Sequence, residues 1–116
     1  MNENELKYGD KKDDVIAEAF NYNYASGIAF CFLNIRKYLK RFHSESEKCY
    51  NQNDIDKVKD YLQRAKENTN TSSRPFEYFE LKIQEKRFKE VYDHSFSFMK
   101  ILIESHDYTA KIIKNT

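Results

Sequence analysis

The sequence has no tryptophan, one proline, two glycines and two cysteines among its 116 residues. Because glycine and proline build most tight turns, their scarcity argues against an all-β fold. The cysteines, Cys31 and Cys49, show no metal-ligand spacing and are too few for a disulfide scaffold. The longest apolar run, residues 28–33, is far shorter than the roughly 20 residues of a transmembrane helix. These absences exclude a membrane protein, a collagen-like chain and a disulfide-rich domain.

The charges and aromatic residues that are present point to a small folded domain. Basic and acidic residues nearly cancel, at 20 against 19, so non-specific binding of nucleic acid is not expected. Aromatic residues make up 16% of the chain, whereas disordered chains contain few of them. The N-terminus is acidic and polar, unlike a secretory signal. We therefore expect a cytoplasmic protein with reduced cysteines.

Apolar residues recur at intervals of three and four along most of the chain, which is the period of an amphipathic helix. This pattern predicts helices that start near Asp14, that cover residues 28–42, and that cover residues 54–65 after an N-cap at Asn53 or Asp54. Residues 21–27 are expected to form a break. We predict a flexible N-terminal arm over residues 1–13 and a single helical domain over residues 14–116. The fold class is all-α, a small bundle of three to five helices with a long C-terminal helical segment.

That C-terminal segment follows Pro75, which suits the first turn of a helix. From residue 76 to about residue 113 there is no glycine or proline, and one unbroken helix would be about 55–60 Å long. The pattern leaves two alternatives, a break near residues 93–95 or a long helix that packs on a partner chain. An aromatic and aliphatic stripe favours the second alternative and a homo-oligomer. The stripe contains Phe88, Tyr92, Phe96, Met99 and Ile103.

Two of the predicted helices carry a polar stripe beside the apolar one. The polar stripe of helix 28–42 is Asn34, Lys37, Tyr38 and Arg41, and that of helix 54–65 is Asp54, Lys57, Tyr61 and Arg64. If the two helices pack antiparallel, the stripes line one cleft that suits a nucleotide or another small phosphate anion. Arg matches phosphate oxygens, and Asn and Tyr can form hydrogen bonds to a base or sugar. The alternative is that Lys and Arg only solvate the helices and that the tyrosines belong to the core.

These stripes resemble the motifs of a known protein family. Residues 33–42 resemble Asn-x-x-Lys-Tyr-x-x-Arg, and residues 54–64 resemble the Asp-Leu-x-Lys-Ala-x-x-Tyr-Leu-like helix that follows it after a variable loop. The family is small, occurs largely in tailed phages and includes nucleotide kinases; the match covers roughly residues 14–65. The chain departs from the family at Leu33, where glycine is usual, at Lys40, where a large aromatic residue is frequent, and in lacking an N-terminal His-Tyr block.

The resemblance implies a nucleotide-binding phage-type protein, in the host cytoplasm if viral, and a deoxynucleoside monophosphate kinase if it is active. Gly9 and Gly27 stand alone, so there is no P-loop. In this hypothesis Arg41 and Asp54 are catalytic. The substrate-binding residues are Asn34, Lys37, Tyr38, Lys57, Tyr61 and Arg64. No cofactor is certain, although Asp54 could orient Mg²⁺. If the His-Tyr block carries chemistry in the family, this chain binds nucleotide without turning it over.

Two alternative functions use other residues. Glu77-x-x-Glu80 and Glu104-x-x-Asp107 resemble the metal motif of all-α, MazG-type nucleotide pyrophosphatases. Carboxylates at this spacing on facing helices can hold Mg²⁺ against a triphosphate; a solvated acidic face is the simpler interpretation. The other alternative is a non-enzymatic helical interaction protein that binds a host protein or a nucleotide signal.

Overall fold

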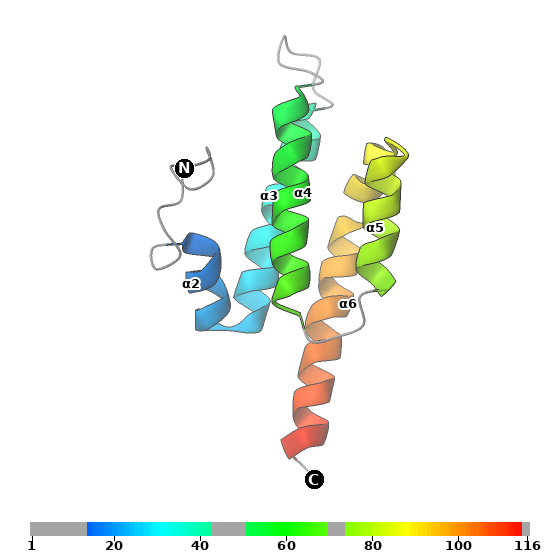
Figure 1. Cartoon of the computed structure of the whole chain (residues 1–116). Coiled ribbons are helices and arrows are strands. Elements are labelled where there is room, and N and C mark those ends of the chain that lie inside the picture. The colour runs from blue at the N-terminus through cyan, green and yellow to red at the C-terminus, as the bar shows by residue number, and fades with distance from the viewer. Residues whose placement is uncertain (1–13, 43–50, 70–73, 115–116) are drawn as a thin grey trace.

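A computed structural model describes residues 14–42, 51–69 and 74–114, with the backbone alone over 107–114. These residues contain no strand and form five helices (Figure 1). The helices are α2 (Val15–Tyr22), α3 (Tyr24–Phe42), α4 (Gln52–Glu67), α5 (Arg74–Gln84) and α6 (Phe88–Lys114). The predicted all-α class, the number of helices and the long C-terminal helical segment are confirmed. The predicted arm, residues 1–13, lies outside the described residues.

The break between α2 and α3 is one residue, much shorter than the sequence predicts. Asn23 is extended, and its side-chain oxygen accepts a hydrogen bond from the Ser26 N–H at 2.7 Å, which caps α3. Gly27 therefore lies inside α3 and is buried. A Cβ atom at Gly27 would come within 2.2 Å of the Phe20 ring, so the glycine permits the close approach of α2 and α3.

The start of α4 also differs from the prediction. Asn51 is the N-cap, and its side-chain oxygen accepts a hydrogen bond from the Asn53 N–H at 2.9 Å. Asp54 is consequently in the first turn of the helix and not at its cap. The positive end of the helix dipole favours a carboxylate at this position.

The break in the C-terminal segment lies at residues 85–87, so the prediction of a break near residues 93–95 is wrong. Lys86 has a φ of 62°, and Arg87 N–H donates to Lys82 O at 2.8 Å while Lys86 N–H donates to Ile83 O at 3.0 Å. This is a Schellman motif, which ends α5. Ser95 is instead fully buried within α6, where its hydroxyl donates to Tyr92 O.

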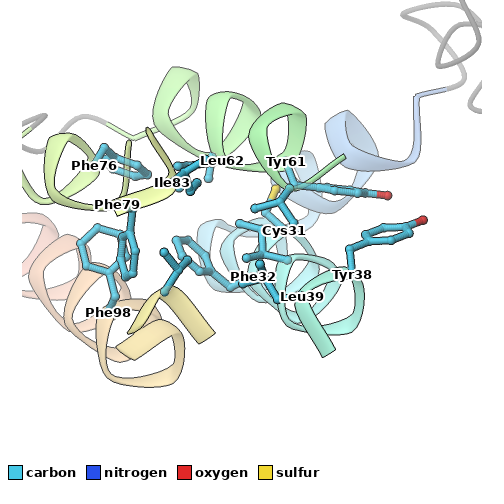
Figure 2. Packing of buried hydrophobic residues seen from close by; sticks show 14 of the residues in the cluster. Cys31, Phe32, Tyr38, Leu39, Tyr61, Leu62, Phe76, Phe79, Ile83 and Phe98 are labelled. Atoms are coloured by element: carbon cyan, nitrogen blue, oxygen red, sulfur yellow. The ribbon is translucent and has the colours of Figure 1, made fainter. Parts of the chain in front are cut away.

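The helix α3 is central to the packing, because α2, α4 and α6 all contact it. It runs antiparallel to α4, as the contacts Tyr24–Thr69 and Arg41–Asp54 show. The helix α5 packs mainly on α6. Figure 2 shows the phenylalanines that join α3, α5 and α6. The ring centroid of Phe98 in α6 lies 4.5 Å from that of Phe79, 5.3 Å from that of Phe76 and 5.4 Å from that of Phe32. This phenylalanine cluster is the part of the core where α3, α5 and α6 meet.

Candidate functional site

Two tyrosines lie side by side where α3 and α4 pack together. Tyr38 of α3 and Tyr61 of α4 are almost fully buried, and their rings are stacked with centroids 6.0 Å apart and 22° between the planes. Figure 2 shows both hydroxyl oxygens pointing to the same side, away from the phenylalanine cluster. The antiparallel packing of the two helices therefore brings two phenol groups, each able to donate and accept a hydrogen bond, to one place.

Two lysines lie beside one ring of this tyrosine pair, that of Tyr38. The Nζ atoms of Lys37 and Lys57 each lie 4.9 Å from the centroid of the Tyr38 ring. Lys37 precedes Tyr38 on α3, whereas Lys57 is one turn before Tyr61 on α4. Both ammonium groups are attracted by the electron-rich ring face but repel each other. A small area that holds two positive charges attracts an anion from solution.

An ion pair lies one helical turn from Tyr38 on α3 and two turns from Tyr61 on α4. Arg41 Nε is 3.7 Å from Asp54 Oδ1; the arginine side chain is 42% exposed and the aspartate side chain only 2%. This distance is too long for a hydrogen bond, so the pair is loose. The other carboxylate oxygen, Asp54 Oδ2, is buried and has no hydrogen-bond partner among the described residues. A buried acceptor without a partner is unusual, since such atoms are normally satisfied.

Six of the sequence-predicted residues thus come together at one place, which we name the tyrosine–lysine site. It consists of Lys37, Tyr38, Arg41, Asp54, Lys57 and Tyr61. In this set the cationic side chains of Lys37 and Arg41 are exposed, whereas both tyrosines and the carboxylate of Asp54 are buried. Because the set also contains a carboxylate, it favours a ligand that carries both an anionic group and hydrogen-bond donors.

The two other predicted site residues, Asn34 and Arg64, interact with groups outside the tyrosine–lysine site. The Asn34 side-chain amide donates to Phe30 O of the same helix at 2.8 Å. Arg64 forms an ion pair with Asp14, which also caps α2 by accepting a hydrogen bond from the Ile16 N–H at 2.8 Å. The sequence pattern predicts a helix start near Asp14 but does not identify Asp14 as its cap or as the partner of Arg64.

The Arg64–Asp14 pair lies near a buried thiol. Burial raises the pKa of Cys31 from 9.0 to about 12; Arg64 opposes this rise, while Asp60 and Asp14 add to it. Burial likewise raises the pKa of Asp60, again against the effect of Arg64. This polar cluster connects α2, α3 and α4, and we assign it a role in stabilising the fold.

The residue Arg36 lies within the first motif but faces α6. Its guanidinium donates to Tyr92 O and Ser95 Oγ, both at 2.8 Å, and lies 4.1 Å from the Tyr92 centroid and 4.2 Å from the Phe96 centroid. Arg36 therefore attaches α3 to α6 and does not belong to the tyrosine–lysine site.

Three of the four acidic residues of the pyrophosphatase alternative have described side chains, and these three do not form a metal-binding cluster. Glu80 is paired with Lys66 at 2.9 Å, Glu104 lies 4.0 Å from Lys100, and Glu77 is an exposed residue in the first turn of α5. No three His, Cys, Asp or Glu side chains lie close enough to hold a metal ion among those that the structure describes. The side chain of Asp107 lies outside that set. Glu77, Glu80 and Glu104 therefore do not form the carboxylate cluster of the pyrophosphatase alternative.

Most side chains of the predicted oligomer stripe pack against the core of their own chain. Phe88, Tyr92, Met99 and Ile103 are partly buried against the core, whereas Phe96 is 49% exposed. Within the described residues, none of the helices is both long enough and apolar enough to cross a membrane.

Comparison of the chain with protein-family models, curated proteins and solved structures gives no match in any of the three. The function is therefore argued from the tyrosine–lysine site itself.

Proposed function

We propose that this protein binds a nucleotide at the tyrosine–lysine site. The observation that carries the proposal is the position of two lysines at 4.9 Å from one tyrosine ring that is itself stacked on a second tyrosine. Phosphate is the natural anion for Lys37, Lys57 and the half-exposed Arg41, because guanidinium and ammonium groups form strong charge-assisted hydrogen bonds with it. The phenols supply hydrogen bonds for a sugar or base.

The carboxylate of Asp54 gives the site a second chemical character. A carboxylate beside a phosphate is repulsive unless a cation lies between them, and Arg41 is next to Asp54 Oδ1. The unpartnered Oδ2 can accept a hydrogen bond from a nucleotide hydroxyl, from water, or bind Mg²⁺ once Arg41 turns to the phosphate. On this proposal Asp54 is the residue that distinguishes a nucleotide from inorganic phosphate.

Monophosphate kinase activity is a further step of the same proposal, supported by the resemblance to the phage family. Phosphoryl transfer depends mainly on positioning and on neutralising charge, and Lys37, Lys57 and Arg41 provide three positive charges. Asp54 would accept the proton of a hydroxyl or orient a cation. The proposal also places the protein in a cytoplasm, where nucleotides are available.

Calorimetric titration of the full chain with a panel of deoxynucleoside monophosphates and with inorganic phosphate tests nucleotide binding. We expect at least one nucleotide to bind, and Lys57→Ala and Arg41→Ala each to weaken binding by about tenfold or more, the value of a lost charge-assisted hydrogen bond. Lys89→Ala, which removes an exposed lysine of α6, is the matched control and should bind like wild type.

Two results would refute the proposal. One is the absence of heat and of thermal stabilisation with every nucleotide at millimolar concentration. The other is an unchanged affinity in Lys57→Ala and Arg41→Ala. Asp54→Asn separates the ligand classes, because it should weaken nucleotide binding while leaving phosphate binding the same or stronger. A coupled phosphoryl-transfer assay on the same variants then tests the kinase step.

A further inference from the structure

The outer surface of α6 carries a polar ridge with an apolar groove on each side. The ridge consists of Ser97, Lys100 and Glu104, which are exposed. One groove, of about 460 Å³, has an apolar lining of Phe96, Met99 and Ile103. The other, of about 250 Å³ between α5 and α6, is lined mainly by apolar side chains and also by His94; the apolar ones are Pro75, Tyr78, Phe79, Phe98 and Ile101. Ser97 borders both grooves.

We propose that a second copy of this chain covers this surface, with the two α6 helices antiparallel across a two-fold axis. Helices pack by placing the ridge of side chains of one into the groove of the other. The surface offers a ridge and adjacent grooves at once, so two copies can insert into each other reciprocally, as a closed two-fold interface requires.

The charges on the ridge are self-complementary in this orientation. Lys100 and Glu104 are one turn apart with side chains that are 75% and 65% exposed. A two-fold axis midway between them places Lys100 opposite Glu104 of the partner subunit and Glu104 opposite Lys100 of the partner subunit. Parallel helices in register would instead bring like charges together, which is unfavourable. The charge pattern thus selects the antiparallel arrangement and a partner with the same pattern.

The length of α6 supports the same partner. The helix has 27 residues, against 19 in α3, and Figure 1 shows its C-terminal end extending beyond the ends of the other helices. Tyr24, the first residue of α3, stacks on His106 of α6 with ring centroids 3.9 Å apart, so α3 begins level with this part of α6. Antiparallel pairing would place the α6 of a second copy along this C-terminal end.

Sedimentation velocity of the full chain over a range of concentrations tests the dimer. Wild type should dimerise, and Ile101→Asp should raise the dissociation constant at least tenfold, because it puts a charge in the α5–α6 groove. Ile101 is 55% exposed, so the monomer should keep its fold, which circular dichroism verifies. Lys59→Glu, an equal change of charge on the exposed face of α4, is the control and should leave dimerisation unchanged.

A pair of charge variants tests the orientation. Lys100→Glu and Glu104→Lys should each weaken the homodimer several-fold, since each places like charges opposite one another. An equimolar mixture of the two should restore the affinity, because every facing pair is then of opposite charge. A monomeric wild type, a dimer insensitive to Ile101→Asp, or a mixture that stays as weak as the single variants overturns the proposal. None of these outcomes depends on nucleotide binding, which uses α3 and α4.

Discussion

Two pairs of helices in this molecule use aromatic residues in different ways. Between α5 and α6, Phe76, Phe79 and Phe98 pack ring against ring and join Phe32 of α3. Between α3 and α4, Tyr38 and Tyr61 stack with their hydroxyl groups on one side and two lysines beside the Tyr38 ring. The first arrangement has no polar atom in its rings, whereas the second carries a polar atom on every ring.

On the proposed function, aromatic residues serve stability in one region of this small core and ligand binding in the other. A phenylalanine contributes only apolar area and shape, so its substitution acts on folding. A buried tyrosine contributes nearly the same area and also carries an oxygen to the boundary of the core. We therefore expect the phenylalanine cluster to hold most of the stability and the tyrosine pair to hold most of the ligand specificity.

The largest effect on stability is expected from Phe98→Ala. Phe98 contacts rings from α3 and α5, so its loss leaves a cavity where three helices meet, and the free energy of unfolding should fall by about 3–5 kcal/mol. Urea denaturation followed by circular dichroism measures this change. Lys59→Ala, on the exposed face of α4, should change it by less than about 0.5 kcal/mol. A Phe98→Ala variant with a loss under about 1 kcal/mol would show that the cluster is not the main apolar core.

The sequence predicts one of these two regions much better than the other. The spacing of Tyr38 and Tyr61 on their helices suffices to bring them together once α3 and α4 are antiparallel. The end of α5 is not predictable in this way, because Lys86 takes the left-handed conformation that glycine usually marks. The role of Arg64 could not be read from its stripe either, since its partner Asp14 belongs to a third helix. Local periodicity specifies faces of helices, and tertiary packing decides which partner each face meets.

The pH dependence of stability tests whether water is excluded from the part of the core between α3 and α4. Burial raises the pKa of Cys31 to about 12 in the folded protein, against 9.0 for the exposed thiol. Between these two values the unfolded chain loses the proton while the folded chain keeps it. The contribution of Cys31 to the free energy of unfolding is therefore fully present below pH 9.0. It falls by about 1.4 kcal/mol per pH unit as the pH rises towards about 12.

Urea denaturation of wild type and Cys31→Ala over this alkaline range isolates the thiol from the other titrating groups. The variant should lose less stability per pH unit than wild type. Identical slopes would mean that water reaches Cys31 and that the tyrosine side of the core is open, which would weaken the contrast with the phenylalanine cluster.

The smallest effect on stability is expected from Tyr61→Phe, which converts a member of the tyrosine pair into the residue type of the phenylalanine cluster. The ring and its stacking on Tyr38 stay, so the free energy of unfolding should change by no more than about 1 kcal/mol, the net value of a typical hydrogen bond. If the hydroxyl serves a ligand, the affinity for a nucleotide should fall while the affinity for inorganic phosphate stays the same. Denaturation and calorimetric titration of one variant measure both quantities. A loss of stability above about 2 kcal/mol with unchanged nucleotide affinity would mean that the hydroxyl groups belong to the folding of the core, and the two aromatic regions would then have the same role.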